Sequence, residues 1–244
     1  MSFLSALFGC NDKTIDIKGP NHETGKVTVV HLDETARIEY ALPGNISKQF
    51  DVDSIREQDE KTKTFDLGTL QNEDFEQDGW RSKRFIDAGR WDYLGPKNEG
   101  LAGELGWLNL TLELNKSELA DFSEKGIQDN IKASFLKNLE VANEEIRSHY
   151  PGYSEDNLAH VLLPPPESFD WVDVNGTRML TWLSNESKGS PKAYYVLPLN
   201  QNYFVSIIVS HHTSVNDDKL LKQITRRIQS DISQILGAFV IKMQ

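Results

Sequence analysis

Cationic and aromatic side chains alternate between residues 79 and 95, and this interleaving is the feature of the sequence best suited to binding. Guanidinium groups offer paired hydrogen-bond donors, and indole rings give a large contact area at low entropic cost, so together they suit an anionic or peptide partner. The predicted binding residues are Trp80, Arg81, Lys83, Arg84, Arg90 and Trp91. The alternative is a solvated hairpin edge whose tryptophans turn into the core.

Other reactive residue types occur without the spacing that their chemistry needs. His211 and His212 follow a predicted strand, where neighbouring side chains point to opposite faces, so the pair is poorly placed to chelate one metal ion. The carboxylates between residues 51 and 78 lack the regular spacing of a calcium loop. The sequence contains no glycine-rich phosphate loop and no paired zinc histidines. We therefore expect no metal, no cofactor and no catalytic residue, with an enzyme site assembled from distant residues as the alternative.

The first ten residues allow two interpretations. Their apolar run ends in Leu7-Phe-Gly-Cys10, which resembles the lipobox at which bacterial lipoproteins are cleaved and lipidated. The run has no basic residue before it and is short for a signal sequence. Either Cys10 anchors a protein of the cell envelope in the membrane, or an N-terminal helix of a cytoplasmic protein docks through Phe3, Leu4, Leu7 and Phe8.

The composition is that of a globular chain. Its 244 residues are 38% hydrophobic and 26% charged, with a net charge of −11. A chain of this size buries about 70–75% of its unfolded surface, enough for a core without disulfides or metal. The negative charge disfavours nucleic acid as a partner. No later stretch approaches the ~20 apolar residues of a membrane-spanning helix.

The last fifty residues carry the clearest pattern of secondary structure. Two β-rich runs, 193–197 and 203–210, flank a short loop and predict a hairpin. The second run is apolar on one face and half polar on the other, which predicts a central strand with a thinner cover on its second side. Asn216 is predicted to cap a helix that starts near residue 217 and ends at Gly237. Its apolar stripe comprises Leu220, Leu221, Ile224, Ile228, Ile232, Ile235 and Leu236.

The remaining elements are predicted from the same periodicities. Residues 126–147 repeat apolar side chains near every fourth position and predict a second amphipathic helix. Residues 51–106, acidic and then rich in glycine and tryptophan, are a possible insertion within a single domain spanning residues 1–244. Edge strands near residues 62–70 are the alternative for the acidic part. Further strands are predicted at 14–18, 26–32, 36–42, 107–114, 169–174, 177–183 and 238–242, the hairpin at Asn175-Gly176 being the strongest turn signal.

The run from Phe169 to the C-terminus is similar to the end of PsbP-like and DcrB-like domains. The similarity rests on the Asn-Gly hairpin, on Tyr194-Tyr-Val-Leu-Pro198, on Tyr203-Phe-Val-Ser-Ile207 and on the long helix with its terminal strand. It implies an antiparallel sheet covered by helices. Proteins with that fold are mostly binding modules, among them photosystem extrinsic subunits, bacterial lipoproteins and chaperones for secreted effectors.

These patterns predict an α+β fold in which two long amphipathic helices pack on one largely antiparallel sheet built from both ends of the chain. The function they favour is that of a non-enzymatic module with a protein or peptide partner. The alternatives are a lipid-anchored envelope protein and an enzyme whose site is not visible in the sequence. The oligomeric state stays open.

Overall fold

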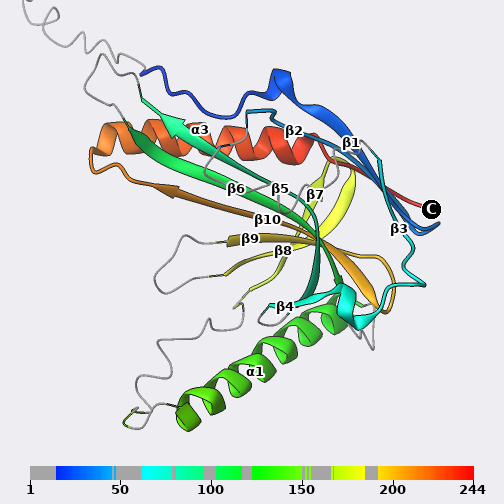
Figure 1. Ribbon diagram of the computed structural model, residues 1–244. Helices are drawn as coiled ribbons and strands as arrows, with labels where there is room; N and C mark the ends of the chain where they lie inside the picture. The colour runs from blue at the N-terminus through cyan, green and yellow to red at the C-terminus, as the bar shows by residue number, and fades with distance from the viewer. Residues whose placement is uncertain are drawn as a thin grey trace, which may run out of the picture.

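The computed structural model describes residues 15–45, 47, 62–78, 81–95, 103–116, 123–149, 152, 154, 166, 168–184 and 192–244. Over these residues the protein has a mixed α+β fold with two β-sheets, and all strand pairs but one are antiparallel. This confirms the predicted fold class at the level of α+β with mostly antiparallel sheets. Figure 1 shows the two long helices of the described chain, α1 (Glu124–His149) and α3 (Asp218–Gly237), which pack on opposite sides of the larger sheet.

The larger sheet has seven strands in the described residues. β6 and β10 lie at its centre, and Leu108, Leu110, Leu112 and Leu114 of β6 are fully buried on the side that faces α3. Asn175 and Gly176 both have positive φ angles, 49° and 86°, as a two-residue hairpin turn of the predicted kind requires. The strand order is β4 (Glu76–Asp78), β5 (Arg81–Leu94), β6 (Glu104–Lys116), β10 (Tyr203–Thr213), β9 (Lys192–Pro198), β8 (Thr177–Ser184) and β7 (Asp170–Val174).

The smaller sheet corrects the prediction of one sheet built from both ends of the chain. Its order among the described strands is β11 (Val240–Met243), β2 (Ala36–Leu42), β1 (Lys26–Leu32) and β3 (Thr62–Phe65), with β3 parallel to β1. Alternating polarity marks a strand with one buried face, but it does not identify the neighbour to which that strand pairs. The strand predicted at 14–18 is also wrong, because Lys18 alone makes a bridge there, to Leu94.

Helix α3 fills the space between the two sheets. Leu220, Ile224, Ile228 and Ile235 are buried in the core that both sheets share, and each such side chain contributes about 1.5–3 kcal/mol. The Asp217 carboxylate, rather than the predicted Asn216, caps the helix by accepting from Leu220 N at 2.8 Å. Gly237 lies inside the helix and takes no left-handed conformation, because the chain leaves through Ala238 in a right-handed one and enters β11.

Helix α1 covers the other side of the large sheet only in part. Ile127, Ile131 and Phe135 are buried against an aromatic and aliphatic cluster that includes Trp182 and Tyr194, whose rings stack at 5.0 Å. Beyond Phe135 no described side chain of α1 is buried. The prediction of two long helices packed on the sheet is thus matched only in part, and the first eight residues of β10 are buried on both faces of the sheet.

Candidate functional sites

The structure separates the residues predicted to bind a partner. The strand register places Arg84 and Trp91 on the α3 side of β5, and Lys83 and Arg90 on the α1 side. Side chains alternate within each half of β5, and a register shift between Phe85 and Asp87 reverses the alternation between the halves. Trp91 is fully buried, and its Nε1 donates to the Pro43 carbonyl at 3.2 Å. Its position agrees with the alternative prediction, in which tryptophan side chains lie in the core. Arg81 begins β5. Trp80 lies outside the described residues, as does Cys10.

Carboxylates of the same chain contact Lys83, Arg84 and Arg90. Arg84 Nη1 lies 3.1 Å from Asp74 Oδ1, and Lys83 Nζ lies 4.0 Å from Glu76 Oε2. The acidic stretch predicted as an exposed excursion therefore supplies carboxylates to the basic stretch that follows it. Arg90 contacts two further carboxylates, those of Asp92 and Glu104, at 3.1 and 3.4 Å. The positive charge of these residues is largely compensated within the protein.

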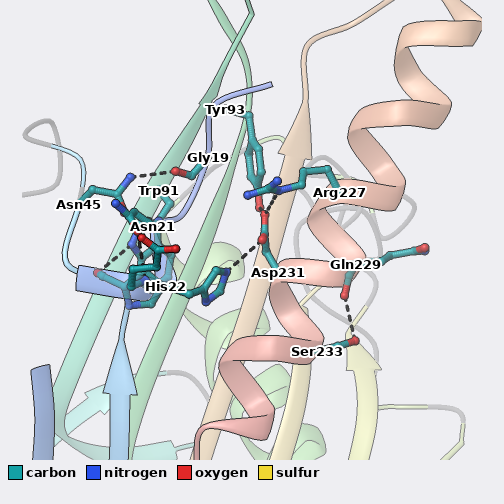
Figure 2. A network of polar contacts seen from close by, with 12 residues as sticks. Gly19, Asn21, His22, Asn45, Trp91, Tyr93, Arg227, Gln229, Asp231 and Ser233 are labelled. Atoms are coloured by element: carbon teal, nitrogen blue, oxygen red, sulfur yellow. Dashed lines mark hydrogen bonds and ion pairs between the residues drawn. The ribbon is translucent and has the colours of Figure 1, made fainter. Parts of the chain in front are cut away.

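A buried carboxylate on α3 gathers three donors from separate parts of the chain (Figure 2). Asp231 is 1% exposed. Its Oδ2 accepts from Tyr93 Oη at 2.9 Å and from Arg227 Nε at 2.9 Å, and its Oδ1 lies 3.0 Å from His22 Nε2. An ionised carboxylate only accepts, so Nε2 of His22 carries a proton in this contact. We call these four residues the Asp231 centre.

The strap, residues 15–25, brings His22 to this centre. Lys18 and Leu94 exchange two backbone hydrogen bonds of 2.9 Å, which tie the strap to β5. Asn45 Nδ2 donates to the Gly19 carbonyl at 2.8 Å. A Cβ atom at Gly19 would lie 2.7 Å from the Tyr93 ring, so only glycine lets the strap approach this closely. The strap thus closes over Tyr93 and Asp231, as the labelled residues of Figure 2 show.

The electrostatics of the Asp231 centre favour a fixed arrangement of protons. Burial raises the pKa of Tyr93 well above its ordinary value of 10.0, and the neighbouring Asp231 carboxylate raises it further. The phenol therefore stays protonated and donates to Asp231. Since Tyr93, Arg227 and His22 supply donors to both carboxylate oxygens, the centre is a satisfied network that joins β5, α3 and the strap.

A second group of polar side chains lies on the α1 side of the large sheet. Ile208, Tyr194 and Trp182 are buried in one cluster with side chains of α1, and the residues two positions along each strand share their face. Those residues are Ser210, Lys192 and Ser184. The strand registers pair Ser210 with both Asn109 and Lys192, and Lys192 with Ser184. We call Asn109, Ser210, Lys192 and Ser184 the polar row, which crosses four neighbouring strands.

Two oxygens of the polar row are buried and lack a hydrogen-bond partner among the described residues. They are Asn109 Oδ1 and Ser184 Oγ, and Ser184 as a whole is 3% exposed. Ser206, on the same face of β10, differs from them. Its Oγ accepts from Asn115 Nδ2 at 2.8 Å and lies 3.5 Å from Glu113 Oε2. Both serines are buried on the same face of the sheet, but only the Ser206 hydroxyl has a hydrogen-bond partner among the described residues.

The histidine pair ends β10 with its rings on opposite faces. His212 is paired with Trp107 on the α1 side, with the two ring centres 5.9 Å apart, while His211 is paired with Leu108 on the α3 side. Burial, and then the neighbouring His212, lowers the pKa of His211. In the part of the chain that the structure describes, no three His, Cys, Asp or Glu side chains are grouped to hold a metal ion.

Sequence reasoning overlooked both sites, although a signal existed for one of them. Asp231 follows Ile228 by three residues and precedes Ile235 by four, so it interrupts the apolar stripe of the predicted helix with a charge. A carboxylate at such a position is buried and needs donors. Nothing in the sequence singles out His22 as one of them. The polar row depends on strand registers that periodicity does not give.

No family model matches the chain, and neither a curated protein nor a solved structure is similar to it. None of the helices in the described ranges combines the length and the apolar character needed to cross a membrane.

Proposed function

We propose that the protein is a non-enzymatic binding module whose site is the polar row on the α1 side of the large sheet. The observation that supports this proposal is the pair of buried oxygens, Asn109 Oδ1 and Ser184 Oγ, for which the described chain provides no donor. A ligand that donates hydrogen bonds to them would complete the row.

The energetic reason is the cost of burying such groups. A buried polar group without a partner costs about 1–3 kcal/mol, so two of them take a large share of a typical stability of about 5–15 kcal/mol. Selection retains destabilising groups where function needs them, and binding sites are the usual location. The cost is recovered when the ligand arrives.

The Asp231 centre is the rival site, and its hydrogen bonding favours a structural role. A histidine beside a carboxylate is a pair that enzymes use as a general base. Here, however, Arg227 and Tyr93 donate hydrogen bonds to the same carboxylate that His22 contacts. The Asp231 carboxylate is also buried, with the strap lying against it. The resemblance of the C-terminal residues to PsbP-like and DcrB-like domains, which are mostly binding modules, also favours binding over catalysis.

Two serine substitutions test the proposal. Ser184→Ala removes an unpaired hydroxyl, so we expect the free energy of unfolding to stay unchanged or to rise by as much as about 1–3 kcal/mol. Ser206→Ala is the matched control, because it removes a paired hydroxyl from the same face and should lower stability by about 1–3 kcal/mol. In a chain of this size 1 kcal/mol corresponds to about 2–4 °C in melting temperature.

The same variants then report on ligands. A thermal-shift screen of peptides, sugars and amphiphiles should find compounds that raise the melting temperature of the wild type more than that of Ser184→Ala, because a ligand that binds only the native state stabilises it. If Ser184→Ala destabilises the protein as much as Ser206→Ala does, and if no compound distinguishes it from the wild type, the row is structural and the proposal fails.

A further inference from the structure

We infer that the polar row takes a neutral, hydroxyl-rich ligand, namely a sugar or another polyol. This inference rests on the proposed function and names the class of ligand for that site. Three features carry it: the hydrogen-bonding capacity of the row, its charge balance and the side chains on either side of it.

The hydrogen-bonding capacity calls for a ligand that donates. The amide oxygen Asn109 Oδ1 can only accept, whereas the hydroxyls of Ser184 and Ser210 both donate and accept. Asn109 and Ser184 are three strands apart, so they are separated by roughly 14 Å at the usual strand spacing. A ligand that reaches both ends needs several donors along its length. Each hydroxyl of a polyol can donate to one group and accept from another.

The charges around the row favour a neutral ligand. Arg90 pairs with Asn109 in the strand register and so lies next to the row, but Asp92 and Glu104 contact its guanidinium. Lys192, within the row, also has an interaction partner. An anion would have to compete with these contacts, and an ammonium group would meet two cations. A neutral hydroxyl avoids both costs.

Aromatic side chains border the row on both sides. Trp107 is half-buried, and the Arg90 guanidinium lies 5.1 Å from the centre of its ring. It is two residues from Asn109 on the same face, while Trp182 and Tyr194 are two residues from Ser184 and Lys192. The half-buried indole of Trp107 suits a ligand that has C–H faces and hydroxyl edges, as a sugar ring does. The rings of Trp182 and Tyr194 stack on each other in the cluster beneath α1 and close the other side of the row.

An extended peptide is the competing ligand class, and the row fits it less well. Half of the polar groups of a peptide backbone are carbonyls, which only accept. A carbonyl that faced Asn109 Oδ1 would leave both oxygens without a donor, which costs free energy in a buried site. Since a hydroxyl reorients to donate, a polyol satisfies the row in more than one alignment.

Saturation-transfer NMR with the unmodified full chain tests the inference. The probes are myo-inositol, glucose, maltotriose and the trisaccharide of N-acetylglucosamine, followed by an array of immobilised glycans. We expect at least one of them to bind. Asn109→Leu and Ser184→Ala should each weaken binding about 2- to 10-fold, which is the effect of losing one neutral hydrogen bond. Ser233→Ala, an exposed site on α3 far from the row, should leave binding unchanged.

The outcomes separate the two proposals. If no sugar or polyol binds while a peptide or amphiphile still distinguishes Ser184→Ala from the wild type, the ligand class is wrong and the binding function stands. If no compound of any class binds and Ser184→Ala destabilises the protein as much as Ser206→Ala does, the row is structural and both proposals are overturned. Binding of a sugar that neither row variant weakens would place the site elsewhere and would also overturn the inference.

Discussion

Replacing Asp231 by alanine should produce a large loss of stability. The carboxylate accepts from Tyr93 and Arg227 and contacts His22, and the substitution would remove all three contacts. A hydrogen bond to a charged group contributes about 1.5–3 kcal/mol when buried, which applies to the contact with Tyr93. The side chain of Arg227 is 44% exposed, so solvent screening limits its contact to about 0–1 kcal/mol.

The contact with His22, whose side chain is 26% exposed, adds about 0–1 kcal/mol, so the three contributions together amount to about 1.5–5 kcal/mol. Most of it comes from leaving the Tyr93 hydroxyl buried without an acceptor. The double substitution Tyr93→Phe with Asp231→Ala should therefore cost less than the sum of the two single ones, with a coupling energy of about 1–3 kcal/mol.

Urea unfolding of the full chain measures these losses. We expect the midpoint to fall with little change in slope, because the same surface is exposed on unfolding. Ser233→Ala, on the exposed face of the same helix, is the control and should stay within about 0.5 kcal/mol of the wild type. A loss below about 1 kcal/mol for Asp231→Ala, where the three contacts together predict about 1.5–5 kcal/mol, would refute the reasoning.

Four further predictions concern pH and backbone space. Because the pKa of Tyr93 is raised in the folded state, unfolded chains lose this proton first as pH rises through 10.0, so stability should fall on the alkaline side and Tyr93→Phe should flatten that fall in pH-dependent melting. Because the pKa of His211 is lowered, unfolded chains bind this proton first as pH falls below 6.5, so His211→Gln should reduce the acid-side loss measured in the same way. Gly19→Ala should destabilise by about 1–3 kcal/mol through contact with the Tyr93 ring, whereas Gly237→Ala, with open space around it, should stabilise by about 0.5–1 kcal/mol in urea unfolding.

Local patterns predicted the elements whose determinants are themselves local. The Asn175-Gly176 turn, the β-rich run of β10 and the apolar stripe of α3 each occupy a single stretch of sequence, and the structure confirms the turn, the strand and the helix. The partition into two sheets could not be predicted in this way, since a strand pattern is compatible with several neighbours.

The candidate sites were harder to predict than the fold, because each joins residues that lie far apart in the sequence. His22 and Asp231 are 209 residues apart, and only the folded chain brings them together. The basic residues chosen from sequence were adjacent in the chain, but strand alternation placed them on two faces, with Trp91 in the core. Proximity in the sequence is thus a poor guide to a shared surface on a sheet.

The pairing of β11 with β2 has a consequence for how the protein folds during its synthesis. β1 and β2 can form a hairpin as soon as they leave the ribosome, but β2 keeps one open edge until β11 arrives. Contacts between distant segments form slowly, and an unpaired strand edge is a template for pairing with another chain. We expect nascent chains that lack β11 to associate with one another, and docking of β11 to be among the last steps that protect the chain from aggregation.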